Sequence, residues 1–600
     1  MRLPSMLPAL LCLLLVHCAM PGRAPDIQPA PAPVTLRILA FNDFHGHLYA
    51  PGKLRLPGSD EPVLAGGADA LAGDIARLRA EQANTIVVAA GDLIGASPLE
   101  SALFHDEPTI EVMNRIGLAV AAVGNHEFDA GQAELLRKLR GGCLEDRAHS
   151  CRGMDVRTPV PFEGARFEML GANVIDSASG RNFLPAFTVR NFDGIRVGFI
   201  GLTLTETANI VLPTAVKGLR FRDEADTVNA LIPELRGQGV TTIVVLIHQG
   251  GEQGPGETPG VDDPNACAAD LQDDERSPIR GIVRRLDDAV DLVIAGHTHR
   301  AFNCRLPNRQ GRSIPVTEAL AYGEMLTRID LTIDRVGGRV KNVDARNLVI
   351  DRSDSRRPPD PEIAALLGRY MRLVAPLSQQ VIGCIAKALP NDSSEAGEIP
   401  AGDLVADAQL EATREPDSGG AQLALVEPGG LRADFPGRSL PHDVTYGEAF
   451  AVQPFGDTLL TMDLSAMQLR ALLEAQFPDC MAQRHASFLQ VSAGVHEVWS
   501  ASAPPCEHIR ELSIEKGGTA EVAVHNGVLT NASQIYRVTV VDYMVKARGG
   551  AAAFKAGQNV TGGMLDIDAL VRFLGHTRPA GQPYGVDGAG HIGARIERVP

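Results

Sequence analysis

The chain has 600 residues, of which 44% are hydrophobic and 22% charged, so it is long enough for more than one globular domain with a sizeable core. The 56 Lys+Arg against 73 Asp+Glu give a net charge of −17, which argues against a nucleic-acid polymer as partner because such polymers bind to clustered positive charge. An anionic substrate would need a local counter-charge, from metal ions or from a few placed arginines.

The N-terminus has the pattern of an export signal. Arg2 precedes the apolar run Leu7–Val16, and a Pro-Gly pair then breaks the pattern. The run is too short for a membrane-spanning helix, which needs about 20 residues, so we predict a signal peptide over residues 1–24, no transmembrane span, and a periplasmic or secreted protein. An N-terminal membrane anchor and a lipid anchor on Cys18 are the alternatives, although His17 stands where a lipoprotein signal carries a small residue.

Cysteines beyond the signal are expected to form disulfides, because an exported protein meets an oxidising compartment. No CxxC pair occurs among them, so a structural zinc site is not expected. Spacing does not determine connectivity, but proximity favours three pairs and leaves Cys384 over: Cys143–Cys151, Cys267–Cys304 and Cys480–Cys506.

Short apolar runs that each end in a polar signature recur along the first half of the chain. Such runs are typical of buried strands, and helical stretches such as Ala68–Ala83 and Ala133–Leu139 lie between several of them. The alternation predicts an α/β fold that gathers the signatures at the C-terminal ends of its strands, where such folds bind ligands. The runs are 36–41, 85–90, 119–123, 241–247 and 292–295, and they lead into Asn42–His45, Gly91-Asp92, Gly124–Glu127, His248–Gly250 and Gly296–His299.

The character of the sequence changes after Ile350. Residues 351–361 (DRSDSRRPPDP) are charged and proline-rich, as in a linker, and Ile363–Ala375 predicts a helix that Pro376 ends. We therefore predict three parts: a first domain over 34–350, a linker and helix over 351–377, and a second domain over 378–600.

The strand ends collect histidine, carboxylate and amide side chains, a mixed set that suits Zn, Mn, Fe or Co. A site with so many donors can hold two divalent ions, and Asp92 would bridge them, since two neighbouring cations need shared negative charge. The pair would generate a hydroxide near neutral pH for in-line attack on phosphorus, and would offset the charge of an anionic substrate.

These signatures resemble those of calcineurin-type metallophosphoesterases. Over nearly the whole mature length the chain is similar to the secreted bacterial 5′-nucleotidases, a family that includes the periplasmic UDP-sugar hydrolases. The resemblance implies an N-terminal four-layer α-β-β-α sandwich, a helical linker and a C-terminal α+β substrate-binding domain. It assigns Asp43, His45, Asp92 and His299 to one metal ion, and Asp92, Asn125, His248 and His297 to the other.

The resemblance also makes His126 and Asp129 a catalytic dyad that stabilises charge at the phosphoryl group. His126 directly follows a ligand and so lies near the reacting phosphate, while Asp129 can orient the imidazole and favour its protonated form. Helix capping is the alternative role for Asp129. Glu127 is expected to be structural, and His47 to be an exposed loop residue.

The second domain is expected to carry specificity. Residues 427–432 resemble the family's Asn-x-Gly-Gly-x-Arg element, with Glu427 replacing the Asn, and Arg432 would grip phosphate with two parallel hydrogen bonds. Residues 453–457 resemble its Pro-Phe-Gly-Asn element, where Phe455 would stack on a nucleobase and Asp457 ends the motif. A solvated arginine and a core phenylalanine are the alternatives for Arg432 and Phe455.

Two departures from the family bear on nucleoside recognition. Tyr543 could supply the second stacking ring if its loop is longer than usual, and Ala551 stands where the family has an acidic residue that contacts ribose. Residues 391–395 lack the arginines that some members have there. Substrates other than ordinary 5′-nucleotides therefore stay open.

Together these patterns predict an exported two-metal phosphohydrolase that directs a hydroxide at the phosphoryl group of nucleotides or related phosphate esters. The expected partner is such a small molecule, not a nucleic-acid polymer. Alternatives on the same scaffold are a 2′,3′-cyclic phosphodiesterase, a nucleotide-sugar pyrophosphatase, and a thiosulfohydrolase that acts on a cysteine S-sulfonate. A non-catalytic binding protein is a further alternative.

Overall fold

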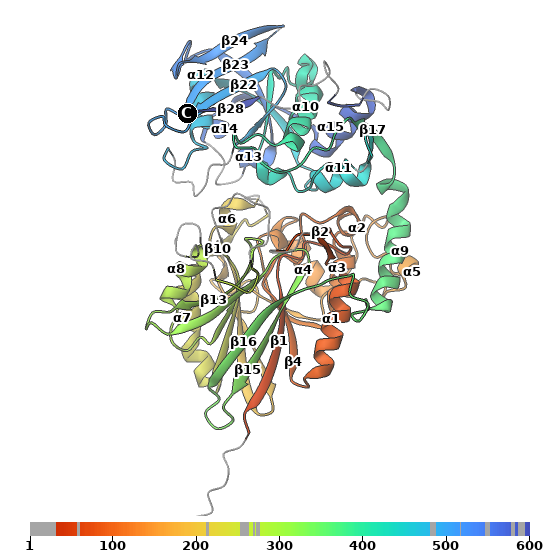
Figure 1. Cartoon of the computed structure of the whole chain (residues 1–600), viewed down its shortest axis with the longest axis vertical. Helices are drawn as coiled ribbons and strands as arrows, with labels where there is room; N and C mark the ends of the chain where they lie inside the picture. The colour runs from red at the N-terminus through yellow and green to blue at the C-terminus, as the bar shows by residue number, and fades with distance from the viewer. Residues whose placement is uncertain are drawn as a thin grey trace, which may run out of the picture.

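The computed structural model describes residues 32–600 apart from 57–60, 212–214, 252–262, 268–270, 272–276, 438, 481–487, 517, 547–551, 578–582 and 586–594. The predicted signal peptide, Cys18 and Ala551 lie outside the described residues. Within the described part, every helix is too short or too polar to cross a bilayer. Figure 1 shows two bodies stacked along the long axis, with α9 (Pro361–Ser378) running along one side.

Two six-stranded sheets form the centre of the N-terminal body. One has the order β16-β15-β1-β4-β5-β6 and the other β13-β14-β12-β11-β9-β8, and the inner strands that lead to the polar signatures are parallel. The first sheet contains β1 (Val34–Phe41), β4 (Thr85–Ala89), β5 (Leu118–Ala122), β6 (Glu168–Leu170), β15 (Met325–Ile333) and β16 (Val340–Val349). The second contains β8 (Phe187–Phe192), β9 (Ile195–Thr203), β11 (Thr242–His248), β12 (Leu292–Ile294), β13 (Ala301–Pro307) and β14 (Ser313–Ala319).

Helices cover the outer face of each sheet, which confirms the predicted four layers (Figure 1). In β1, Leu36 and Ile38 pack between the sheets, whereas Leu39 and Phe41 pack against helices. Both faces of the second half of the strand are therefore buried, which is why Ile38–Phe41 is a continuous apolar run. The covering helices are α1 (Ala68–Glu81), α3 (Glu107–Ile116) and α4 (Gln132–Arg140) on the first sheet, and α7 (Glu224–Gly237) and α8 (Pro278–Arg285) on the second.

Helix α9 connects the two bodies. It begins at the Asp360 cap, whose side chain accepts hydrogen bonds from two backbone N–H groups of the first turn. The prediction that Pro376 ends this helix is wrong, because the helix continues to Ser378. A proline has no N–H group, so it leaves one carbonyl group of the preceding turn without its helical hydrogen bond. In the last turn this is a small loss, and the helix continues past Pro376. The preceding segment is tied to α1 through the ion pairs Arg352–Asp69 and Arg357–Asp74.

The C-terminal body is α+β, as predicted, with two five-stranded sheets of order β21-β18-β26-β20-β27 and β25-β24-β23-β22-β28. The first contains β18 (Leu423–Val426), β20 (Thr458–Ser465), β21 (Gln490–Val491), β26 (Ile535–Val541) and β27 (Gln558–Leu565). The second contains β22 (Val495–Ser500), β23 (Ile509–Lys516), β24 (Thr519–His525), β25 (Val528–Leu529) and β28 (Ile596–Val599). The main helices are α10 (Pro400–Arg414), α11 (Tyr446–Val452), α12 (Ala466–Glu474) and α15 (Asp566–Arg572).

Shorter elements complete the described chain. They are β2 (Gly52–Leu54), β3 (Val63–Ala65), β7 (Val174–Asp176), β10 (Leu219–Phe221), β17 (Val381–Ile385), β19 (His442–Thr445), α2 (Leu99–Ala102), α5 (Gly153–Val156), α6 (Thr207–Ile210), α13 (Asp542–Lys546), α14 (Ala552–Lys555), η1 (His126–Phe128), η2 (Pro416–Ser418), η3 (Pro428–Gly430) and η4 (Phe573–Thr577).

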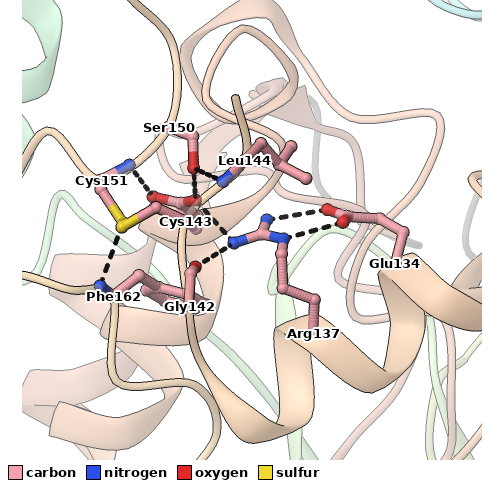
Figure 2. The surroundings of a disulfide bond; sticks show 9 residues. Glu134, Arg137, Gly142, Cys143, Leu144, Ser150, Cys151 and Phe162 are labelled. Carbon is pink, nitrogen blue, oxygen red and sulfur yellow. Dashed lines mark hydrogen bonds and ion pairs between the residues drawn. A yellow bond between two sulfur atoms is a disulfide. The ribbon is translucent and has the colours of Figure 1, made fainter. Parts of the chain in front are cut away.

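The three cysteine pairs that proximity favours are disulfides: Cys143–Cys151, Cys267–Cys304 and Cys480–Cys506. Cys384 is free and buried. Figure 2 shows the first of the three, where Arg137 reaches the carbonyl group of Gly142 beside the disulfide. Glu107 accepts hydrogen bonds from the Ser150 hydroxyl group at 2.6 Å and from the Cys151 N–H at 2.7 Å, so the second end of this loop is held as well.

Candidate active site

The predicted metal ligands lie at the C-terminal ends of five strands, at the end of the sandwich nearest the C-terminal body (Figure 1). The sheets bring together strands that are far apart in the sequence, as where β11 pairs with β12 and β1 pairs with β4. Asp43 and His45 follow β1, Asp92 follows β4, Asn125 follows β5, His248 ends β11, and His297 and His299 follow β12.

The side chains of these residues converge. The Nε2 atom of His248 lies 2.9 Å from Asp92 Oδ2 and 3.1 Å from Asn125 Oδ1. The Nε2 atom of His45 lies 3.2 Å from His299 Nε2 and 3.6 Å from Asp92 Oδ2. Asp92 thus contacts both sides of the cluster. Three sets of possible donor atoms lie within 4.8 Å of one another: Asp43, His45 and His299; His45, Asp92 and His126; and Asp92, His248 and His297.

The orientation of the histidines fits bound cations. Nδ1 of His45 lies 2.8 Å from the Gly95 carbonyl oxygen, and Nδ1 of His248 lies 2.9 Å from the Ala90 carbonyl oxygen. A carbonyl oxygen only accepts, so each Nδ1 carries a proton, and in the neutral ring the Nε2 lone pair points into the cluster. Lone pairs of nitrogen and oxygen therefore face one another in the cluster, and a divalent cation bound between them would accept these lone pairs and remove their mutual repulsion.

The electrostatics of the cluster lead to the same conclusion. Burial acts to lower the pKa of His248, but the adjacent Asp92 carboxylate raises it to about 10. Burial lowers the pKa of His297 to about 3, which keeps this ring neutral. The negative charge that would hold a proton on His248 also attracts a metal ion, and binding of the metal releases the proton.

The backbone at the cluster is strained. Asp43, His45, Asp92, His297 and His299 all have positive φ, between 46° and 77°, a region that residues other than glycine seldom adopt. Such strain persists only where surrounding contacts hold it, and it concentrates at functional sites.

Two motif glycines allow the close packing of this cluster. A Cβ atom on Gly91 would lie 2.6 Å from Nδ1 of His248, and one on Gly124 would overlap the Asp92 carboxylate. Only glycine fits before Asp92 and before Asn125, because the side chain of a predicted metal ligand occupies the space that a Cβ atom would need.

Buried carboxylates hold the loops of the cluster. Glu127 accepts hydrogen bonds from the backbone N–H groups of Leu93 at 2.7 Å and Gly124 at 2.6 Å, in agreement with its expected structural role. Glu318 accepts from the Thr298 hydroxyl group at 2.8 Å and from the Arg300 N–H at 3.1 Å. Sequence reasoning missed Glu318, because no motif surrounds it on β14.

His126 and Asp129 form a close pair. Nδ1 of His126 lies 2.7 Å from Asp129 Oδ2, and the His126 backbone N–H donates to Asp92 Oδ1 at 2.9 Å. Burial acts to lower the pKa of His126, but the carboxylates of Asp129 and Asp92 raise it. The following helix, α4, begins after Gly131 and has no side-chain cap, so the alternative capping role for Asp129 does not hold there.

Tyr322, in the turn before β15, is a further residue that sequence reasoning missed. Its ring centroid lies 5.3 Å from that of His299, and its backbone N–H donates to the Asp43 carbonyl oxygen at 2.7 Å. The expectation that His47 is exposed is wrong: it is half-buried, with its ring centroid 4.0 Å from that of Tyr322. The turn that carries Tyr322, 275 residues further along the chain, packs against His47, and nothing local in the sequence indicates that contact.

A cavity of about 260 Å³ lies beside the cluster and is lined by both bodies. The Arg432 guanidinium carbon lies 5.9 Å from the centroid of the Phe455 ring, which lies 6.2 Å from the His126 ring centroid. All four predicted substrate-binding residues therefore face the same space as the His126–Asp129 pair. The lining residues are Asn125, His126, Asp129, Val211, His297, Glu427, Gly429, Gly430, Arg432, Phe455, Asp457 and Tyr543.

Comparison with known proteins agrees with this arrangement. Residues 36–301 match the family model described as calcineurin-like phosphoesterase, and residues 381–556 match the one described as 5′-nucleotidase, C-terminal domain. The chain belongs to the metallophosphoesterase family whose members carry a 5′-nucleotidase C-terminal domain. It is a metal-dependent phosphoester hydrolase, and its His and Asp cluster provides candidate metal-binding groups.

Relatives of the family cover most of the chain. A "Probable 5'-nucleotidase" of Treponema pallidum is 24% identical over 632 residues, which cover 94% of each protein. "Endonuclease YhcR" of Bacillus subtilis is 29% identical over 90% of this chain, which spans only 40% of that longer protein. The crystal structure of a 5′-nucleotidase precursor from Thermus thermophilus superimposes with a TM-score of 0.72 at 25% identity, covering 94% of this chain and 99% of that one.

Proposed function

We propose that the chain is an exported phosphohydrolase that binds two divalent ions, of Zn, Mn, Fe or Co, and releases phosphate from 5′-nucleotides. One ion would be held by Asp43, His45, Asp92 and His299, and the other by Asp92, Asn125, His248 and His297. The observation that carries the proposal is the convergence of these donors at the cavity that Arg432 lines. The disulfides and the N-terminal pattern support export.

Bound divalent ions would polarise the phosphoryl group and lower the pKa of a water molecule that attacks it. The chain's own residues would do the rest. Arg432 can bind two phosphate oxygens through its planar guanidinium group. His126, held by Asp129, can donate a proton from Nε2 to oxygen as negative charge develops, because the dyad favours its charged form.

The nucleoside would occupy the remainder of the cavity. Phe455 and Tyr543 offer ring faces to a base, and Asp457 offers an acceptor to its hydroxyl or amino groups. The fold itself does not choose among phosphate esters, so the choice rests on these side chains.

A substrate screen tests the proposal. The purified chain is stripped with a chelator, reloaded separately with each candidate metal, and assayed for phosphate release from 5′-nucleotides. A cyclic phosphodiester, a nucleotide sugar and a cysteine S-sulfonate serve as comparison substrates. We expect activity on 5′-nucleotides that depends on added metal. Metal-dependent hydrolysis of only one comparison substrate, or no bound metal and no hydrolysis, would refute the proposal.

A further inference from the structure

Glu427 is a half-buried carboxylate that faces the cavity beside Phe455. It directly follows β18 and precedes the short helix η3, yet its side chain caps no backbone N–H group. Within the described part of the chain, its carboxylate makes no hydrogen bond or ion pair. A half-buried carboxylate that lines a cavity and has no donor among the described residues can accept hydrogen bonds from a ligand, so this position is suited to a ligand that donates them.

The charges around the cavity are arranged unevenly. Arg432 lies against Phe455, with its guanidinium carbon 5.9 Å from the ring centroid, and the Phe455 ring in turn lies 6.2 Å from the His126 ring beside the metal cluster. Glu427 lies near Tyr543, whose pKa rises through burial and through the negative charges of Glu427, Asp129 and Asp457. Among the described lining residues, Arg432 is the one arginine or lysine. With the phosphate at Arg432, the rest of the substrate would lie against the other lining residues of the C-terminal body, which include Glu427, Asp457 and Tyr543.

The carboxylate geometry restricts which base fits there. Two carboxylate oxygens accept two parallel N–H bonds. Guanine presents such a pair on one edge, N1–H beside its 2-amino group. Adenine presents the lone pair of N1 there, uracil has an acceptor on each side of its N–H, and cytosine has an acceptor beside its amino group.

We infer that Glu427 determines base specificity, and that it makes guanine the preferred base by accepting hydrogen bonds from N1–H and the 2-amino group. This inference rests on the proposed nucleotide hydrolysis at the same cavity. Phe455 and Tyr543 would supply the faces between which the base lies, and the Asp457 carboxylate on the same side adds to the preference for a donor. Two parallel hydrogen bonds between a side chain and a base edge favour the matching base over another base by about 10- to 100-fold.

The test compares guanosine, inosine and adenosine 5′-monophosphates as substrates of the metal-loaded full chain. Inosine keeps N1–H and lacks the 2-amino group, so it reports one of the two hydrogen bonds. We expect kcat/KM to fall in the order guanosine, inosine, adenosine, with a guanosine-to-adenosine ratio of about 10–100. In Glu427→Asn the ratio should come within about threefold of one. Asp417→Asn removes one exposed charge from the same body and should leave the ratio as it is.

The outcomes separate this inference from the proposed function. If all three nucleotides are hydrolysed equally well, or if Glu427→Asn keeps the wild-type ratio, the base-specificity inference fails and nucleotide hydrolysis stands. If no nucleotide is hydrolysed, calorimetric binding of the free nucleosides decides the role of Glu427. Tighter binding of guanosine than adenosine that Glu427→Asn abolishes supports the inference, and equal or undetectable binding of both overturns it.

Discussion

Asp92 is the residue on which most of the site depends, because its carboxylate contacts both sides of the ligand cluster. Asp92→Asn keeps the size of the side chain and removes the shared negative charge. We expect it to lose bound metal and to lower kcat by about 10³-fold or more. Elemental analysis and phosphate release check this, with Asp417→Asn as the matched control. Full metal content in Asp92→Asn would contradict the bridging role.

His126 should affect the reaction without affecting the metals. Its ring contacts Asp129, and its backbone N–H donates a hydrogen bond to Asp92 that holds the residue in place. We expect His126→Ala to retain its metal and to lower kcat by about 10²–10⁴-fold, as for a lost general acid. Metal content measured beside kcat distinguishes this result from a disrupted site. A variant with normal kcat would remove His126 from the reaction.

The pH dependence of base preference follows from Glu427. Burial and the neighbouring Asp457 carboxylate raise the pKa of Glu427 to about 7, and Tyr543 also lies close to it. Above this pH the carboxylate accepts the two guanine N–H bonds. Below it the carboxyl group can donate its proton to N1 of adenine and accept from the adenine amino group.

The ratio of kcat/KM for the guanosine over the adenosine nucleotide should therefore rise as pH increases through about 7. Both substrates use the same metal cluster and the same His126, so the titration of those groups cancels in the ratio. Glu427→Gln should make the ratio independent of pH. A wild-type ratio that is flat or that falls with rising pH would contradict this expectation.

At the scale of elements, the strands that carry the ligands could be predicted from sequence. Both faces are covered at the C-terminal ends of β1, β4 and β11, so each of these ends is a continuous apolar run that stops where the polar signature begins. Pro376 predicts the wrong end for α9, because a proline breaks a helix in its interior but is tolerated in the last turn. Glu318 and Tyr322 could not be predicted from local sequence. They reach the site only because β14 pairs with β12 and β15 pairs with β1.

The disulfide loop after α4 should contribute to stability. Cys143 and Cys151 enclose a short loop that Glu107 already holds by hydrogen bonds. Replacing both cysteines by serine should lower the free energy of unfolding by about 2–3 kcal/mol, because the unfolded chain gains freedom. Thermal denaturation of the double variant beside wild type measures this. An unchanged Tm would show that the hydrogen bonds alone hold the loop.

At the scale of the whole molecule, the site needs both bodies. The N-terminal body supplies the metal cluster and His126, while Arg432 and Phe455 reach the cavity from the C-terminal body. Arg432→Ala should raise KM for nucleotides about 10-fold or more, because a charge-assisted pair of hydrogen bonds to phosphate is lost. Arg432→Lys keeps the charge but not the paired geometry and should recover only part of the affinity. Steady-state kinetics identical to wild type would exclude Arg432 from the site.

The acidic chain can accommodate an anionic substrate because positive charge is concentrated at one place. The net charge is −17, yet a pair of divalent ions and Arg432 would face the phosphate. The most direct test is a crystal structure of the chain grown with Mn²⁺, with anomalous scattering measured for that metal. We expect two peaks about 3.5–4 Å apart between Asp43 and Asn125, with Asp92 in contact with both. No peak in this cluster, or a single ion without contact to Asp92, would contradict a two-metal centre.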